Sequence, residues 1–214
     1  MHYSSPQRKA LALLVPLHLF IIAASNYLVQ FPLQVFGLQT TWGALSFPLI
    51  FLATDLTVRV FGAALARRII LTVMLPALAL SYLFSVLFLD GVYQGASGLL
   101  VFNTFVARIA LASFIAYVAG QFLDVHVFSR LKDNPRWWIA PTSSTLIGGL
   151  IDTILFFSIA FYRSTDAFMA SHWPEIAAVD YAFKLLISLA LFVPAYGVMM
   201  NTFGYRLTHS PLSR

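Results

Sequence analysis

Charged side chains interrupt stretches of this chain that are otherwise apolar enough to cross a membrane. Three are acidic and three are basic: Asp55, Arg59, Arg108, Asp152, Asp180 and Lys184. A charge in the hydrocarbon core of a bilayer costs at least about 2.5–3.5 kcal/mol, so ionisable residues inside membrane helices commonly mark substrate, ion or proton pathways. Because the six charges balance in sign, we expect them to converge on a polar cavity between helices, as in a transporter.

Two pairs of these charges stand four residues apart, Asp55 with Arg59 and Asp180 with Lys184. Side chains with this spacing meet along one face of a helix, so each pair could neutralise itself without any ligand. Arg59 could also extend its guanidinium group to water at the membrane surface. Structural neutralisation and ligand binding therefore both stay open for these four residues.

The depth of each charge follows from the rise of a helix, about 1.5 Å per residue. Arg108 lies about 12 Å and Asp152 about 15 Å from the outer ends of their predicted helices. Matched depths and opposite signs predict an Arg108–Asp152 ion pair, which could serve the fold or orient a ligand. Asp55 belongs to the cytoplasmic half, with Arg59 one turn nearer the water.

The composition is typical of a membrane protein. The chain has 214 residues, of which 60% are hydrophobic and 10% charged, whereas a soluble domain is about 45–50% apolar and about 25% charged. A membrane-spanning helix needs about 20 apolar residues, so one domain, residues 1–214, can hold several. We place helices near 10–30, 43–63, 69–89, 100–122, 138–162 and 177–203. The expected fold is all-α with six transmembrane helices.

Lysine and arginine are distributed unevenly between the predicted loops. Nine lie on one side of the predicted helices: Arg8, Lys9, Arg67, Arg68, Arg130, Lys132, Arg136, Arg206 and Arg214. Only Arg163 lies on the other side. Because positive residues mark cytoplasmic loops, this bias predicts an even number of spans with both termini in the cytoplasm. The same bias explains the net charge of +5, so this charge does not indicate that the protein binds nucleic acid.

Several classes of function are disfavoured by what is missing. Cysteine is absent, which excludes disulfides and thiolate metal sites. The chain has no phosphate-binding loop, no H-E-x-x-H zinc pair and no G-x-S-x-G elbow. Asp55 and Asp152 are predicted at different depths, which argues against an aspartyl dyad. His18, the only histidine inside a predicted span, is expected to hydrogen-bond a neighbouring helix. We therefore expect no enzyme, no cofactor and no metal ion.

The chain resembles the bacterial queuosine-precursor transporter family over nearly its whole length. The resemblance is carried by SNYLVQ at 25–30, TTWG at 40–43, ATDLTVR at 53–59, ARR at 66–68, FVARIA at 105–110, RWW at 136–138 and VDYAFK at 179–184. It implies six helices and import of 7-cyano-7-deazaguanine and its 7-aminomethyl analogue across the bacterial inner membrane, for tRNA modification. It also implies a likeness to vitamin-binding subunits of energy-coupling-factor importers, without their ATPase module.

A guanine-like substrate suggests roles for individual residues. Its N1–H and exocyclic amine can donate together to one carboxylate, which we expect to be Asp152, while O6 accepts from Arg108 or Asn26. The residues expected to bind substrate are Asn26, Trp42, Arg108, Asp152, Asp180 and Lys184. Asp55 is the candidate for a coupling proton, and Arg59 is grouped with it in coupling or gating.

Other functions fit the same architecture. The chain could carry another purine or a vitamin, or it could be a substrate-binding subunit that needs an energising partner. A membrane enzyme or assembly factor is disfavoured because no catalytic constellation is recognisable. The expected partners are a 7-deazaguanine substrate and the lipid bilayer, and the sequence leaves a homodimer open.

Overall fold

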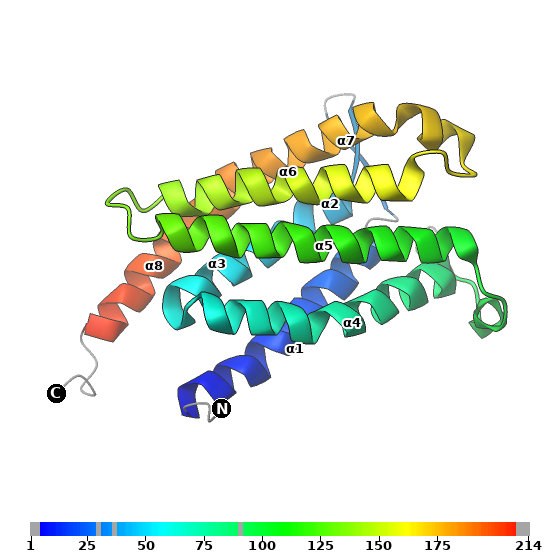
Figure 1. Cartoon of the computed structure of the whole chain (residues 1–214). Coiled ribbons are helices and arrows are strands. Elements are labelled where there is room, and N and C mark those ends of the chain that lie inside the picture. The colour runs from blue at the N-terminus through cyan, green and yellow to red at the C-terminus, as the bar shows by residue number, and fades with distance from the viewer. Residues whose placement is uncertain (1–4, 29–30, 36–37, 90–91, 209–214) are drawn as a thin grey trace.

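The computed structural model describes residues 5–28, 31–35, 38–89 and 92–208. These residues form helices joined by short turns and by two small β-hairpins (Figure 1). The elements in order are α1 Ser5–Leu28, β1 Pro32–Val35, β2 Leu38–Thr41, α2 Trp42–Ser46, α3 Leu49–Phe61, α4 Ala63–Leu87, β3 Phe88–Leu89, β4 Val92–Tyr93, the 3-10 helix η1 Ala96–Leu100, α5 Thr104–Leu131, α6 Ile139–Phe161, α7 Ala167–Ile187, the π-helical segment η2 Ser188–Phe192 and α8 Val193–Thr208. Each hairpin is antiparallel.

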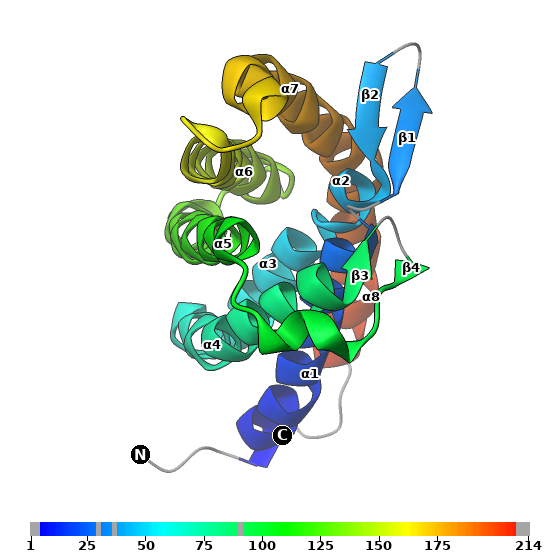
Figure 2. The same cartoon turned by 90° about the vertical axis from the view of Figure 1, so that its right-hand side faces the viewer.

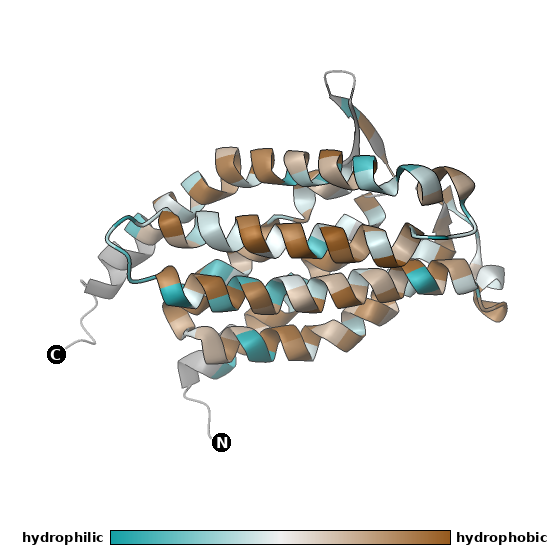
Figure 3. Ribbon diagram, turned by 45° about the horizontal axis from the view of Figure 1, so that its top comes forward, coloured by the Kyte–Doolittle hydropathy of each residue, from teal (hydrophilic) through white to brown (hydrophobic). Residues whose placement is uncertain are grey.

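Five helical stretches in the described part of the chain are long and apolar enough to cross a membrane. They are Trp42–Phe61, Ala63–Leu87, Thr104–Leu131, Ile139–Phe161 and Ala167–Asn201. The apolar part of α1 is shorter, Leu11–Ser25. Apolar residues recur along the helices (Figure 3). Many large ones are exposed at the surface, among them Phe20, Leu75 and Leu186, each at least 59% exposed. Such a surface suits contact with lipid, so the chain is a multi-pass membrane protein.

The helices form a curved layer around a central one. Viewed along the bundle, α4, α5, α6 and α7 follow one another in an arc, and α3 lies on its inner side (Figure 2). The largest buried apolar cluster joins α3 and α4 and includes Ile50, Val58, Ile69, Ile70 and Val73, none of them measurably exposed. The core therefore sits where α3 meets the arc, and it holds the polar residues of α3 in place.

The predicted helix 43–63 is two helices, α2 and α3, which are separated at Phe47-Pro48. Proline has no backbone N–H and cannot continue the hydrogen-bond ladder. At the other end, α3 and α4 are joined by Gly62 alone, which has φ of 86°, a conformation that favours glycine. Arg67 and Arg68, which we expected in a loop, therefore lie in the first turns of α4.

Two other helices begin or end far from the predicted bounds. The helix predicted over 100–122 runs from Thr104 to Leu131. It starts where the Asn103 side chain accepts a hydrogen bond from the Val106 N–H, 3.1 Å away, a typical helix N-cap. The helix predicted to begin at 177 begins at Ala167, where Asp166 caps it in the same way. Polar capping residues, and not hydropathy, set both starts.

Candidate functional site

Helix α6 carries a row of small and polar residues that faces the other helices. Ser144, Gly148 and Asp152 follow one another at four-residue spacing, which places them on one face of the helix. The exposed fraction is 0% for Ser144 and 4% for Asp152. Each end of this row meets a separate cluster of charged side chains.

The first cluster holds Lys184 between two carboxylates. Its Nζ lies 2.7 Å from Asp180 Oδ2 on the same helix, α7, and 3.6 Å from Asp152 Oδ2 on α6. The same ammonium group lies 3.5 Å from Thr153 Oγ1 and 5.1 Å from the centre of the Phe47 ring. The predicted contact between Asp180 and Lys184 is confirmed. With both acids ionised, this cluster carries a net charge of −1.

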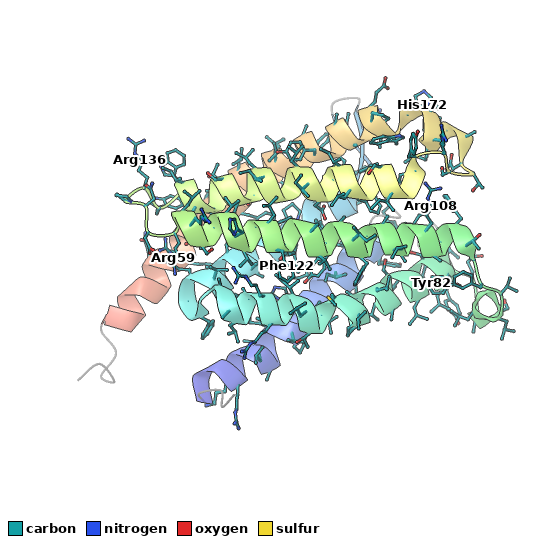
Figure 4. The ribbon with its side chains drawn as sticks, in the orientation of Figure 1. Arg59, Tyr82, Arg108, Phe122, Arg136 and His172 are labelled. Carbon is teal, nitrogen blue, oxygen red and sulfur yellow. The ribbon has the colours of Figure 1, made fainter. Side chains whose placement is uncertain are left out.

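The predicted Arg108–Asp152 ion pair is wrong. Arg108 Nε donates to the Ile159 carbonyl at 2.7 Å, and its two NH₂ groups donate to the carbonyls of Tyr162 and Arg163. The side chain thus caps the C-terminal end of α6, where carbonyl groups lack helical partners. Because α5 begins at 104 and not at 100, Arg108 lies one turn from the helix end, level with the end of α6 (Figure 4). Asp152 lies nine residues before that end of α6.

Asp55 and Arg59 do not pair along α3, although their spacing allows it. Arg59 Nε donates to the Tyr196 hydroxyl on α8 at 2.9 Å. Asp55 accepts from the Ser144 hydroxyl on α6, with its two oxygens at 3.2 and 3.4 Å. Arg59 and Arg108 lie toward opposite ends of the bundle (Figure 4). The six charges therefore do not converge on one cavity as we expected.

The second cluster contains an acid that the sequence analysis missed. Asp124 on α5 is fully buried. Its Cβ would lie 3.2 Å from a Cβ placed on Gly148 of α6, one helical turn from Ser144, whose hydroxyl donates to Asp55. We had ended the helix at residue 122, which left Asp124 in a loop. The apolar residues Val125 and Phe128, both fully buried, continue the helix past it. That continuation was the signal in the sequence.

A third polar group links three helices beside these clusters. His18 on α1 places Nε2 3.4 Å from Thr54 Oγ1 on α3, and Thr54 donates to Gln121 Oε1 on α5. His18 Nδ1 lies 2.8 Å from the Leu14 carbonyl. The expectation that His18 hydrogen-bonds a neighbouring helix is confirmed. Buried side-chain hydrogen bonds of this kind hold helices in register inside a bilayer.

Two small pockets open near the clusters. One is lined by α3, α6, η2 and α8, with Asp55, Thr145, Ser188 and Tyr196 among its residues. The other lies between α1, α4, α5 and the turn that joins α2 to α3, and it is lined by Phe47, Phe114, Tyr117, Ser81 and Ser113, among others. Phe47 thus both lines this second pocket and lies against the Lys184 ammonium group.

The two remaining predicted substrate residues lie next to the β1–β2 hairpin in the sequence. Trp42 is the first residue of α2 and is 48% exposed. Its backbone N–H donates to the Phe31 carbonyl at 3.2 Å. Asn26 belongs to α1, but its side chain lies outside the described part of the structure. Substrate contacts by both residues stay predictions.

Comparison with known proteins places the chain in a family. Residues 41–199 match the family described as putative vitamin uptake transporter. The chain is 62% identical to the queuosine precursor transporter of Escherichia coli K12, over 96% of this chain and 93% of that protein. It is 55% identical to a probable queuosine precursor transporter of Haemophilus influenzae, over 91% of this chain and 88% of the relative.

A more distant relative agrees with these two. A probable queuosine precursor transporter of Bacillus subtilis is 29% identical over 83% of this chain and 79% of its own length. No solved structure matches the chain. The matched region contains both charged clusters. This chain therefore belongs to the queuosine precursor transporter family, a family of membrane transporters and not of enzymes.

Proposed function

We propose that this protein imports queuosine precursors, 7-cyano-7-deazaguanine and 7-aminomethyl-7-deazaguanine, across the bacterial inner membrane for tRNA modification. The observation that carries the proposal is 62% identity to the Escherichia coli queuosine precursor transporter over 96% of the chain. The buried acid–base clusters support it, because buried charges inside membrane helices commonly belong to transport pathways.

We propose six transmembrane helices with both termini in the cytoplasm. The five long apolar stretches and the shorter apolar part of α1 supply the six spans. The start of α1, the α3–α4 junction, the α5–α6 turn and the end of α8 lie at the same end of the bundle (Figure 1). These segments adjoin or contain most of the lysine and arginine residues that mark a cytoplasmic face.

Asp152, Asp180 and Lys184 are the proposed centre of the substrate site. A guanine-like ring offers N1–H and an amine as donors on one edge and O6 as an acceptor. In our proposal Asp152 accepts hydrogen bonds from the N1–H and the amine of the ring. Lys184 moves away from Asp152 and donates a hydrogen bond to O6, while Asp180 continues to balance the charge of Lys184.

Phe47 provides a flat surface against which the heterocycle can stack, since its ring already faces the Lys184 ammonium group. Such a contact contributes about 1–3 kcal/mol in base stacking. Asn26 and Trp42 are proposed to complete the site.

The test is rescue of queuosine in tRNA. The host strain makes no precursor and lacks its own transporter, so queuosine appears only when this protein imports precursor supplied in the medium. The chain should restore queuosine, and Asp152→Asn should abolish the rescue at equal membrane abundance. Asp133→Asn, at an exposed position in the turn after α5, is the matched control and should behave as wild type. Failure of the wild-type chain to restore queuosine would refute the function.

A second function is favoured by the family description, which names vitamin uptake. In that case the chain binds another purine or a vitamin, or serves as a substrate-binding subunit with an energising partner. Uptake of labelled 7-cyano-7-deazaguanine by the purified chain in liposomes distinguishes these cases. Uptake without a second protein excludes the need for a partner, and competition by biotin but not by guanine would favour the vitamin.

A further inference from the structure

Two buried carboxyl groups outside the proposed substrate cluster lie beside one hydroxyl donor. Asp55 on α3 is 2% exposed and Asp124 on α5 is 0% exposed. The Ser144 hydroxyl has one proton but three acceptors in range, namely both Asp55 oxygens and the Pro141 carbonyl. Neither oxygen of Asp124 accepts a hydrogen bond from any residue that the structure describes. Among the described residues, one side-chain hydroxyl therefore serves Asp55 and none serves Asp124, which is too few hydrogen bonds for two carboxylates.

Three basic side chains of the surrounding helices are engaged elsewhere: His18 with Leu14 and Thr54, Arg59 with Tyr196, and Lys184 with Asp152 and Asp180. Two further titratable groups lie on α5: the buried Tyr117 hydroxyl has no hydrogen-bond partner among the described residues, and His126 is exposed. Tyr196 on α8 lines the same pocket as Asp55. Its hydroxyl accepts a hydrogen bond from Arg59, and neither ion pair among the described residues joins Arg59 to Asp55 or Asp124.

Adjacent buried carboxyl groups without a cation repel each other strongly when both are ionised, and one proton held between them removes the repulsion. We propose that Asp55 and Asp124 form a proton-binding site, which takes up one proton and releases it as the transporter turns over. The step is a proton transfer between water and a carboxylate oxygen, with no other bond changed. The small pocket that reaches Asp55 between α6, η2 and α8 is the proposed route for water to the site.

The close contact between α5 and α6 connects this site to the substrate cluster. A Cβ placed on Gly148 would lie 3.2 Å from Asp124 Cβ, and one placed on Gly120 would lie 3.0 Å from Asp152 Cβ. The two acids thus lie on either side of one backbone-to-backbone contact, so a shift of α5 against α6 moves both. Binding at one site changes affinity at the other, and this coupling is reciprocal. The inference rests on the proposed transport function and adds its energy source.

The experiment uses the purified full chain in liposomes with labelled 7-cyano-7-deazaguanine, which is neutral. The membrane potential is held at zero, and the interior is set one pH unit more alkaline than the bath. One proton per substrate can then drive about tenfold accumulation. Wild type and the Asp133→Asn control should approach this ratio. Asp124→Asn and Asp55→Asn should reach a ratio near one while they still exchange labelled for unlabelled precursor.

Several outcomes would overturn the inference. Accumulation by Asp124→Asn at the wild-type ratio would show that the pair carries no coupling proton. Accumulation driven by a sodium gradient and not by pH would assign the coupling to sodium. If Asp124→Asn, Asp55→Asn and Ser144→Ala all lose exchange, the cluster is structural. Wild-type exchange without pH-driven accumulation refutes this inference alone, whereas absence of any wild-type exchange refutes the proposed function with it.

Discussion

Replacing Gly148 by alanine tests the contact on which the arrangement of both charged clusters depends. A Cβ at this position would lie 3.1 Å from the Gly120 carbonyl oxygen, 3.1 Å from Phe51 Cε1 and 3.2 Å from Asp124 Cβ. These atoms belong to α3 and α5, and one of them is backbone, so the helices must separate to admit the methyl group. Overpacking of this kind typically costs about 1–3 kcal/mol.

The neighbouring glycine supplies a matched control. A Cβ at Gly149 would meet only Tyr181 Cε2, at an ordinary contact distance of 3.7 Å. Both glycines lie inside α6, so the gain in helix propensity from alanine, about 1 kcal/mol, is common to both variants and cancels. The difference in unfolding free energy between the two variants is therefore the overpacking cost, about 1–3 kcal/mol.

Thermal unfolding in one detergent at one heating rate measures this difference. For a chain of this size about 1 kcal/mol shifts Tm by roughly 2–4 °C, so Gly148→Ala should unfold about 2–12 °C below Gly149→Ala. It should also import precursor more slowly at equal abundance, because α5 and α6 no longer hold Asp124 and Asp152 in their present positions. Equal Tm values for the two variants would refute the close packing of α5 on α6 at this position.

Three further predictions concern the charged side chains. Lys184→Met should lower Tm and abolish import, because removing one partner of a buried ion pair costs about 3–5 kcal/mol. Adding Asp180→Asn to this variant should recover part of the lost Tm but not the import. An unchanged Tm in the single variant would contradict the buried ion pair. Arg108→Gln should lower Tm by removing charged hydrogen bonds worth about 1.5–3 kcal/mol each, yet leave substrate Kd unchanged; a weakened Kd measured at equal folding would instead support direct substrate contact. Tyr196→Phe removes the hydroxyl that accepts a hydrogen bond from Arg59, and it should slow transport without changing the substrate Kd. Transport and binding assays on the same preparation measure both quantities. An unchanged transport rate would exclude a gating role for the contact between Arg59 and Tyr196.

Local spacing and hydropathy were enough to predict part of the molecule. The long apolar stretches indicated membrane helices, because no soluble core of this size could bury them. The contact between Asp180 and Lys184 followed from their four-residue spacing, since both side chains belong to one helix and its geometry alone brings them together. Family membership was also predictable, because it rests on the residues themselves.

Tertiary structure alone decided which helices the other charges contact. Arg108 caps α6 and Lys184 pairs with Asp152, whereas the estimated depths predicted a pair of Arg108 with Asp152. One helical turn, about 5.4 Å, is enough to exchange such partners, and the offset between helices depends on polar caps and on close contacts such as Gly120 with Gly148. The proposed pair of Asp55 and Asp124 depends on the same contacts, because the two residues lie on different helices and no spacing within either helix can bring them together.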